Sequence, residues 1–398
     1  MQDGNLICYW KGQATDFIDR NPEFRWLPLT NDLAVGKVKH AHRAGMLQVK
    51  LTLNPLRTNP ELNFDQYPNW NSSIPKRLSS FNLRCFIFQC RDLPPADAEG
   101  TSDVYLSVWN QTGETVQTKV IHDNLNPIFY EAKEIQLNIG DLSTAPPIVF
   151  NVWDKDEDLL DLDDDDYLGS ARIDLAEASI VINTREVERD AKRLRGKPSM
   201  KFTNDANELN QIPTPKWHDV RGGLNDKLPA CGQVLCSFIL VEEGTSFNFR
   251  SQLSTLNLSE KVRTKSFNVE INVLGLRDLQ SFGILPIKKP FIQFNIRSLL
   301  PPERAEAVQN IKTAPKATGM NPNIHEVISF SSALPVEELY CPKLACEVYD
   351  FICKGLSQPI IGSFVIDIGK IMQEQLKERS DELQNAVKCI KQIKDKIE

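Results

Sequence analysis

The chain has 398 residues, of which 41 % are hydrophobic and 25 % charged, a composition typical of a globular protein with more than one domain. Its 53 acidic residues outnumber the 46 basic ones and leave a formal charge of −7, which argues against nucleic acid as a partner. The acidity is local. Nine of the thirteen residues from 154 to 166 are Asp or Glu and one is Lys, so this segment alone carries −8.

No stretch approaches the roughly 18 apolar residues that cross a bilayer, and the N-terminus lacks the layout of a signal peptide. Nine cysteines without a dense framework predict free thiols in a reducing compartment, so we expect a soluble, cytoplasmic chain. Three cysteine pairs have the spacing C-x4-C. Five residues along a strand place the two thiols on opposite faces, which argues against zinc.

The N-terminal region contains a Trp, a polar stretch, a Gly and an alternating strand, in RWLPLTNDLAVGKVKHAHRAGMLQVKLTL. The same order recurs in KWHDVRGGLNDKLPACGQVLCSFIL at 216–240. We therefore interpret residues 1–54 as the terminal part of a preceding domain of the same kind as the one that ends near residue 240. An independent hairpin packed on the next domain is the alternative. Residues 55–80, rich in Asn, Pro and Ser, form a predicted linker.

Two longer segments repeat one another. Arg-Asp-Leu at 91–93 returns at 277–279, and Asn126-Pro127 returns as Asn321-Pro322. Near-constant offsets indicate a duplicated domain, with copies at 81–243 and 266–372 and a Ser/Thr-rich linker at 244–265. Short strands separated by turn residues predict an all-β fold of tandem antiparallel β-sandwiches. Because the second copy lacks the Trp, Gly and strand that close the first, the chain resembles a fragment of a longer array.

Two helices are expected outside this β pattern. Residues 184–197 predict a surface helix inserted in the first copy, and their mixed charge favours solvent over lipid. Residues 373–398 predict a C-terminal amphipathic helix. Its apolar stripe consists of Leu376, Leu383, Val387, Ile390, Ile393 and Ile397. We expect this helix to dock on the neighbouring sandwich, with coiled-coil pairing as the alternative.

Acidic residues gather in two loops of the first copy that we expect at the same end of the sandwich. Asp97 and Asp103 flank one loop, and Asp154, Asp156 and Asp166 belong to the other. Ca²⁺ takes about six to eight oxygen ligands, which five carboxylates with carbonyls and water can supply. Packed carboxylates without a cation repel one another. The sequence therefore predicts a calcium site.

Two alternatives explain the acidic loop less well. An EF-hand requires Gly where Leu159 stands and a helix before the loop, where this chain has a predicted strand. A solvated acidic loop without metal affinity leaves Asp97 and Asp103 unexplained.

The segments LPPADAEGTSDVYLSV, NLNPIFYE and VWDKD…DDYLGSARIDL resemble a C2 domain of the calcium-binding kind. The resemblance places the five aspartates named above on the family's five ligand positions. The second loop is longer than usual and rich in Asp, which adds further candidate metal ligands: Asp158, Asp161, Asp163, Asp164 and Asp165. The Pro usual after the second aspartate is replaced by Val104.

The order of segments is more specific than one C2 motif. PKRLSSFNLRCFIFQCRDL, GQVLCSFILVEE, FNVEINVLGLRDLQ and PVEELYCPKLACEVYD are similar to ferlin segments that bridge two successive C2 domains. Ferlins are multi-C2 proteins of membrane fusion and repair, and the resemblance covers about residues 75–370. It implies a parent protein with a C-terminal membrane anchor.

The second copy departs from the calcium-binding pattern. The residues in register with Asp97, Asp103, Asp156 and Asp166 are Gly283, Lys289, Ile352 and Pro359. Only Asp350 keeps a carboxylate, in register with Asp154, so we expect this domain to be calcium-independent. Candidate contacts to anionic lipid in this copy are Lys288, Lys289, Lys312 and Lys316.

Together these features predict Ca²⁺-dependent binding to anionic phospholipid membranes in vesicle fusion, trafficking or repair. Leu159, Leu160 and Leu162 at the loop tip would enter the bilayer interface. The expected location is cytoplasmic and peripheral on a membrane or vesicle, with fusion-machinery proteins as further candidate partners. A calcium-independent protein-interaction scaffold is the alternative. We expect no enzymatic activity, because G-x-S-x-G, Walker and H-E-x-x-H motifs are absent from the sequence.

Overall fold

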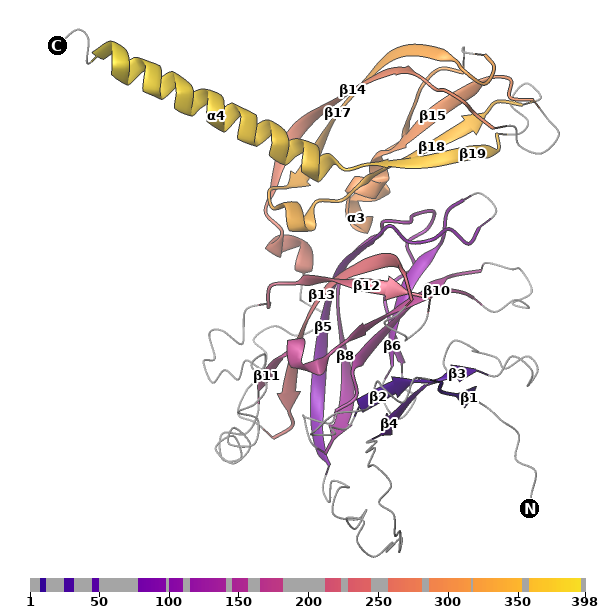
Figure 1. The fold of residues 1–398 in the computed structure, drawn as a ribbon, viewed down its shortest axis with the longest axis vertical. Helices are drawn as coiled ribbons and strands as arrows, with labels where there is room; N and C mark the ends of the chain where they lie inside the picture. Colours follow the sequence, from indigo (N-terminus) through magenta and orange to yellow (C-terminus); the bar gives the residue numbers. More distant parts are fainter. Residues whose placement is uncertain are drawn as a thin grey trace, which may run out of the picture.

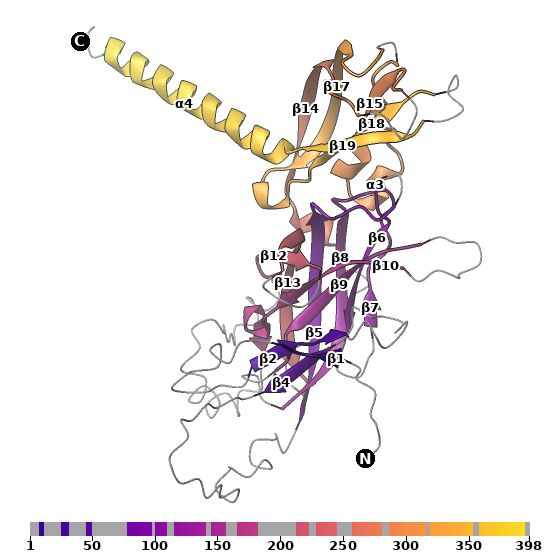
Figure 2. The ribbon, with the colours of Figure 1, turned by 45° about the vertical axis from the view of Figure 1, so that its right-hand side comes forward.

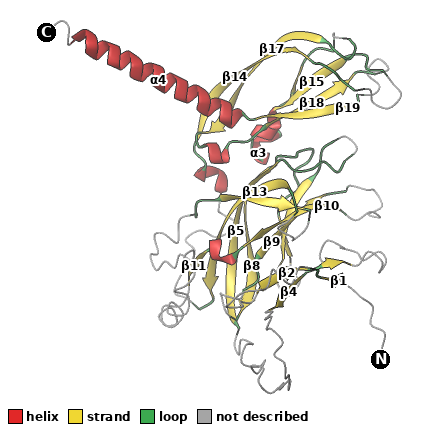
Figure 3. Ribbon diagram, viewed as in Figure 1, coloured by secondary structure: helices red, strands yellow, loops and turns green. Residues whose placement is uncertain are grey.

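The structure of the chain is a computed structural model in which two β-sandwiches follow one another and a long helix follows the second (Figures 1 and 3). The predicted fold class, antiparallel β-sandwiches with a C-terminal helix, is confirmed. The described residues are 8–11, 25–31, 45–49, 78–97, 100–109, 115–140, 145–156, 165–181, 212–222, 228–244, 257–280, 286–315, 318–352 and 358–394.

The N-terminal region contributes two short antiparallel strand pairs. β1 (Cys8–Tyr9) pairs with β3 (Thr30–Asn31), and β2 (Arg25–Pro28) pairs with β4 (Met46–Val49). The second pair forms a hairpin in which Trp26 lies opposite Gln48, and Leu29 N donates to Gly45 O (3.0 Å). The hairpin touches the first sandwich at β10, where Arg172 Nη2 donates to Trp26 O (3.3 Å).

The first sandwich has two four-stranded layers, β7-β6-β9-β10 and β12-β13-β5-β8. Two residue pairs, Ser170 with Arg221 and Ala171 with Val220, join β10 to β12 and so connect the layers. The strands are β5 (Ser79–Arg91), β6 (Val104–Trp109), β7 (Thr115–Gln117), β8 (Ile128–Ile139), β9 (Ile148–Asp154), β10 (Asp166–Ile173), β12 (Lys216–Arg221) and β13 (Ala230–Glu242). β11 (Ser179–Val181), after the 3-10 helix η5 (Leu175–Glu177), adds a parallel pair to β13.

The core of this sandwich lies between the layers, because alternate residues of each strand point inward. Along β5 the inward side chains are Phe81, Leu83, Cys85 and Ile87, each 3 % exposed or less. They meet side chains of β9 and β13, including the tilted ring pair of Phe150 and Phe238, whose centroids are 5.7 Å apart.

The second sandwich repeats this architecture with fewer strands. One layer is β16-β15-β18-β19 and the other is the pair β14-β17. Its elements are η7 (Leu258–Lys261), β14 (Thr264–Gly275), β15 (Pro290–Asn295), η8 (Ile296–Leu299), α3 (Pro302–Ala305), β16 (Ile311–Lys312), β17 (Asn323–Pro335), η9 (Glu338–Tyr340), β18 (Leu344–Asp350), β19 (Ile360–Ile366) and α4 (Ile368–Lys394). In the first copy, β10 is followed by η5, β11, β12 and β13. In the second copy, β19, the strand equivalent to β10, is followed by α4.

The repeated sequence motifs form the same turn in both copies. Asp92 and Asp278 have positive φ angles of 55° and 54°. Their backbone N–H groups donate to the side-chain oxygens of Asn126 (3.0 Å) and Asn321 (2.8 Å). Asn and Asp tolerate or stabilise such turns, which explains why Arg-Asp-Leu and Asn-Pro recur together.

Helix α4 projects away from the second sandwich in both views (Figures 1 and 2). It begins at Ile368, five residues before the predicted start, and only its first turns are docked. Ile368 and Met372 are buried, and Gln373 Nε2 donates to Val336 O (3.3 Å). Leu376, the first member of the predicted stripe, is 41 % exposed. None of the described helices, α4 included, has an apolar stretch of the length a bilayer crossing needs.

The two sandwiches share a small apolar contact. The outward side chains of Phe86, Phe88 and Leu235 are covered by Leu258 and Val262 near η7 and by residues of η9. The rings of Phe88 and Tyr340 lie 5.4 Å apart. Beside this cluster, Lys343 Nζ contacts both carboxylate oxygens of Asp92 at 2.6 Å.

One glycine pair gives a test of this architecture. A Cβ on Gly169 of β10 would lie 2.7 Å from the backbone oxygen of Arg221 in β12, whereas one on Gly362, its counterpart in β19, would meet no described residue within 4 Å. We expect Gly169→Ala to lower the free energy of unfolding by about 1–3 kcal/mol through overpacking and Gly362→Ala to change it by less than about 0.5 kcal/mol. Urea unfolding of dilute protein measures both, and equal effects would contradict the difference in strand packing.

Candidate functional site

Three strand ends of the first sandwich bring carboxylates together at one end. Val104, the first residue of β6, lies opposite Asp154 at the end of β9, and Asp154 lies opposite Asp166 at the start of β10. Asp103 directly precedes β6 and Asp156 follows β9 by two residues. The pairing therefore places four of the five predicted ligands at adjacent strand ends, and Asp97 belongs to the loop before β6.

Asp154 is the centre of this group. Its residue is 1 % exposed, and its Oδ1 accepts a hydrogen bond from Asp103 N (2.5 Å). Its Oδ2 is buried and has no hydrogen-bond partner among the described residues. Burial, together with the charges of Asp97, Asp103 and Asp156, raises the pKa of this carboxyl to about 6, although the hydrogen bond from Asp103 N opposes them. The negative charges of Asp97, Asp103 and Asp156 therefore act on Asp154.

The carboxylate of Asp103 also meets the loop between β7 and β8. Its Oδ1 accepts a hydrogen bond from Asp123 N (2.8 Å), and its Oδ2 lies 2.9 Å from His122 Nδ1. Thr101 Oγ1 lies within 3.4 Å of Asp97 Oδ2 and 3.3 Å of Asp123 Oδ1. Nothing in the spacing of His122 or Asp123 marks them as neighbours of the site. Only the folded loop reveals the contact.

Asp165, one of the further candidate ligands, is held by two other groups. Its carboxylate accepts hydrogen bonds from Tyr105 Oη (2.6 Å) and Lys155 Nζ (2.9 Å). Burial tends to raise the pKa of Asp165, but these two hydrogen bonds and the charge of Lys155 outweigh it, so the pKa lies below its ordinary value. The segment between Lys155 and Asp165 lies largely outside the described residues. That gap contains Asp158, Asp161, Asp163, Asp164, Leu159, Leu160 and Leu162.

The donor set fits a hard divalent cation. Within the described ranges, no group of three or more His, Cys, Asp or Glu side chains has the geometry of a metal site. Within the described part of the chain, the buried Oδ2 of Asp154 nevertheless lacks a partner, and a buried carboxylate oxygen without one is costly. A calcium ion would supply the missing partner and would also offset the mutual repulsion of the carboxylates. Asp97, Asp103, Asp154, Asp156 and Asp166 are the residues that would hold it.

The second sandwich satisfies the equivalent position without a cation. Pro290 lies opposite Asp350 as Val104 lies opposite Asp154. Here the backbone N–H of Lys288 donates to both carboxylate oxygens of Asp350 (3.1 and 3.0 Å), and that of Lys289 donates to Oδ1 (2.7 Å).

The other substituted positions agree with this difference where the structure describes them. Pro359 immediately precedes β19, at the position equivalent to Asp166, and Ile352 is buried. Gly283 lies outside the described residues. No carboxylate group like that of the first sandwich therefore surrounds Asp350 in the described part of the second.

The candidate lipid-contacting lysines do not share one environment. The side chains of Lys288 and Lys289 are exposed. Lys312 Nζ lies 5.7 Å from the ring of Phe291 and 5.8 Å from that of Tyr349. Lys316 lies outside the described residues.

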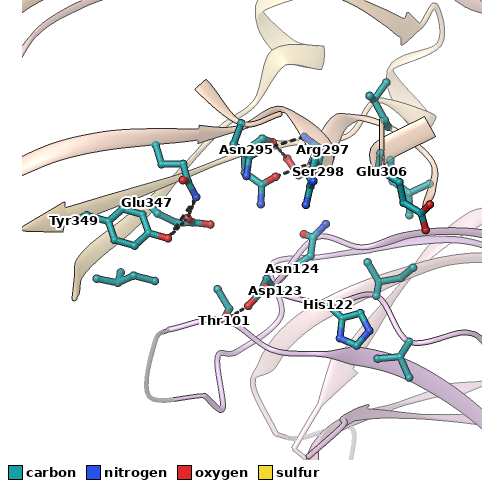
Figure 4. Close-up of a pocket in the computed structure, with 18 of the residues that line it drawn as sticks. Thr101, His122, Asp123, Asn124, Asn295, Arg297, Ser298, Glu306, Glu347 and Tyr349 are labelled. Carbon is teal, nitrogen blue, oxygen red and sulfur yellow. Dashed lines mark hydrogen bonds between the residues drawn. The ribbon is translucent and has the colours of Figure 1, made fainter. Parts of the chain in front are cut away.

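A cavity of about 660 Å³, lined by polar and apolar residues, lies between the two sandwiches. Figure 4 shows Thr101, His122, Asp123 and Asn124 on the side of the first sandwich. On the other side it shows the second sandwich contributing Asn295, Arg297, Ser298, Glu306, Glu347 and Tyr349. Because His122 and Asp123 also contact Asp103, the carboxylate site and this cavity share one wall.

The C2 domain family matches two stretches of the chain, residues 81–194 and 268–383. Mouse myoferlin is 27 % identical over 309 residues, which cover 73 % of this chain and 13 % of that protein. Human myoferlin is 25 % identical over 308 residues with the same coverage. The chain thus spans about an eighth of the length of these relatives. Synaptotagmin-1 of Caenorhabditis elegans is 34 % identical over 76 residues, 19 % of this chain and 17 % of that protein.

Among solved structures, the two C2 domains of extended synaptotagmin 2 align over 80 % of this chain and 87 % of that one, with 17 % identity and a TM-score of 0.24. This alignment is too weak to support an inference. The family match falls on the two sandwiches, and the myoferlin alignments span both. The chain therefore belongs to the C2 domain family and carries two C2 domains in a ferlin-like tandem.

Proposed function

We propose that the first C2 domain is a calcium-responsive module that docks the chain on anionic phospholipid membranes. The observation that carries this proposal is the buried Oδ2 of Asp154, which has no partner in the described part of the chain and lies at the meeting point of three acidic strand ends. Such a site is incomplete without a cation. Calcium is the cation class that matches a set of carboxylates with flexible geometry.

The electrostatics of the segment explain how calcium changes membrane affinity. Residues 154–166 carry −8, which repels an anionic lipid surface when no cation is bound. Two or three Ca²⁺ ions would offset most of this charge. Coordination positions that the protein leaves open are then available to lipid phosphate oxygens. Leu159, Leu160 and Leu162 would add apolar contact with the bilayer interface, up to about 1.5–3 kcal/mol each when fully buried.

The second C2 domain would act without calcium in this scheme, because backbone amides already satisfy Asp350. Its exposed Lys288 and Lys289, with Lys312 and Lys316, would add a constitutive attraction to anionic headgroups, about 1 kcal/mol for each lysine near the surface. The chain would then serve membrane trafficking, as in vesicle fusion or membrane repair, from a cytoplasmic, peripheral position. Fusion-machinery proteins are the further partners of this role, and no enzymatic step is part of it.

Liposome co-sedimentation tests the proposal. The chain is mixed with vesicles of phosphatidylcholine alone or with added phosphatidylserine, each in Ca²⁺ or in EGTA. We expect calcium to increase the bound fraction at least about tenfold on anionic vesicles and to have little effect on neutral ones. Equal binding in Ca²⁺ and EGTA contradicts the proposal. It would favour the calcium-independent scaffold, for which isothermal titration with millimolar Ca²⁺ would give no heat.

A further inference from the structure

The loop between β7 and β8, residues 118–127, touches the carboxylate site of the first C2 domain. Asp103 Oδ1 accepts a hydrogen bond from Asp123 N (2.8 Å), and Asp103 Oδ2 lies 2.9 Å from His122 Nδ1. Each carboxylate oxygen has two lone pairs, so one hydrogen bond on each oxygen leaves room for a cation. The β7–β8 loop therefore orients the Asp103 carboxylate and leaves it able to bind a metal ion.

Backbone hydrogen bonds tie this loop to the strand end that carries Asp103. Val104 N donates to Ile121 O and Ile121 N donates to Val104 O, both at 2.9 Å. On the other side of Asp103, Asn124 N donates to Ser102 O (3.0 Å). Because these bonds flank Asp103 in both directions, a displacement of the loop changes the position of its carboxylate.

The end of the loop reaches the second domain through a series of side-chain hydrogen bonds. Asn126 N donates to Asn124 Oδ1 (2.8 Å), and Asp92 N donates to Asn126 Oδ1 (3.0 Å). The carboxylate of Asp92 in turn accepts from Lys343 Nζ of the second domain, at 2.6 Å from both oxygens. Asn124 and Asn126 are 8 % and 5 % exposed, so water competes little for their hydrogen bonds. The loop that orients Asp103 is thus connected to Lys343.

The middle of the loop also acts on the second domain across the cavity. Figure 4 shows Asp123 on one wall and Tyr349 on the other. Burial raises the pKa of Tyr349, and so do the hydrogen bond to Glu347 and the charge of Glu347. The charge of Asp123 acts in the same direction, whereas the hydrogen bond from Gln293 opposes it. The β7–β8 loop therefore interacts with the second domain at two places.

We propose that the second C2 domain helps to position the calcium site of the first, because it holds the β7–β8 loop that orients Asp103. This inference rests on the proposed calcium-binding function and goes beyond it, since calcium affinity in one domain then depends on contact with the other. A carboxylate that is already held loses less freedom when it binds a cation, so the contact between the domains favours calcium binding. By linkage, calcium favours the contact by the same factor. Asp92, Asn124, Asn126 and Lys343 are positioning residues in this scheme.

Isothermal titration of the full chain with calcium, without membranes, tests the proposal. The variant Tyr340→Ala with Lys343→Glu loosens the contact between the domains. It removes the ring that lies 5.4 Å from that of Phe88 and places a negative charge beside Asp92. We expect the dissociation constant for calcium to rise at least about fivefold. The added negative charge alone would attract calcium and lower the dissociation constant, so the two explanations predict opposite signs.

Two control variants separate positioning from charge and from loss of structure. Lys377→Glu makes the same change of charge at an exposed position of α4, and it should change the dissociation constant less than about twofold because distant exposed charges are screened. Lys343→Arg can keep the ion pair with Asp92 and should bind calcium as the natural sequence does. An unchanged or lowered dissociation constant in the double variant overturns this inference alone. A natural chain that gives no calcium heat overturns the proposed function and this inference together.

Hydrogen exchange of the full chain tests the reciprocal effect. In η9, Tyr340 N donates to Glu337 O (3.1 Å) and Cys341 N donates to Glu338 O (3.0 Å). Calcium should slow exchange at these amides at least about fivefold, the factor by which the contact favours calcium binding. The amides of α4 beyond Leu376 should exchange at the same rate with and without calcium. No change in η9, or the same change in the double variant, contradicts the coupling.

Discussion

Replacing Asp154 with Asn should stabilise the protein in the absence of calcium and remove its stabilisation by calcium. At neutral pH the ionised carboxylate is buried with one oxygen unpartnered, and Asn relieves this charge at nearly the same volume. The pKa of Asp154 is raised from 3.8 to about 6, which corresponds to a cost of up to about 3 kcal/mol when the group is ionised. The gain in free energy of unfolding should approach this value at pH 7 in EGTA.

The same substitution at Asp350 should have the opposite sign. Asp350 accepts hydrogen bonds from the backbone N–H groups of Lys288 and Lys289. Both N–H groups can still donate to the Oδ1 of Asn, but its Nδ2, a donor, would replace the Oδ2 that lies 3.0 Å from Lys288 N, so two donors would face each other. We expect Asp350→Asn to lower the free energy of unfolding by about 1–3 kcal/mol, with or without calcium. Because Asp154 and Asp350 occupy equivalent positions in their strands, comparing the two variants isolates the effect of the groups that surround each carboxylate.

The effect at Asp154 should also depend on pH. The folded protein binds the proton at Asp154 more tightly than the unfolded chain, because the folded-state pKa is the higher one. The contribution of this group to stability is therefore greatest below about pH 4 and falls as the pH rises through the window up to about 6. The stabilising effect of Asp154→Asn should consequently be larger at pH 7 than at pH 5. Urea unfolding in EGTA at both pH values measures it, and a pH-independent difference would contradict the assignment.

The double substitution Asp103→Asn with Asp156→Asn should abolish calcium-dependent liposome binding. It removes two of the carboxylates whose charges act on Asp154, and calcium affinity depends on the number of charged ligands. We expect the calcium concentration for half-maximal binding to rise at least about 100-fold. Co-sedimentation with phosphatidylserine vesicles over a calcium titration gives this value directly.

A charge-matched control accompanies the double variant. Asp278→Asn with Asp367→Asn removes two negative charges far from the site. Asn suits both positions, because Asp278 lies in a turn with φ of 54° and the side chain of Asp367 accepts a hydrogen bond from Lys370 N, which an Asn oxygen can also accept. This control should keep the calcium response of the natural sequence. If both double variants lose the response equally, overall charge governs binding and the proposed site does not.

The repeated fold was predictable because its determinants are local. Period-two alternation and the recurring Arg-Asp-Leu and Asn-Pro motifs are visible in the sequence, and each motif forms its turn from nearby backbone and side-chain groups. The register of the aspartates also follows from the strands, since Asp103, Asp154 and Asp166 adjoin neighbouring strand ends.

Other features depend on contacts between distant segments. The partners of Asp165 could not be predicted, because Tyr105 lies 60 residues away. One feature of the sequence does indicate the contact between the domains. In β5 the sequence CFIF is apolar without alternation, which is typical of a strand buried on both faces, and Phe86 and Phe88 are the residues that η7 and η9 cover. The apolar stripe shows which side of α4 can pack against another surface, but it does not show which surface that is. The early start of α4 and its projection into solvent therefore could not be predicted from it.

The strand order of the first domain also sets when it can fold. Arg91 in β5 donates a hydrogen bond to Gln233 in β13, 142 residues later in the sequence. The two central strands of one layer therefore come from the beginning and the end of the domain's sequence. Pairings over such separations form slowly, and during synthesis β5 can pair with β13 only after β13 has left the ribosome, although its other partner, β8, emerges much earlier. The cost of the long intervening chain is modest in stability, since closure entropy grows only with the logarithm of loop length. Length inserted between β11 and β12 therefore delays folding more than it weakens the folded domain.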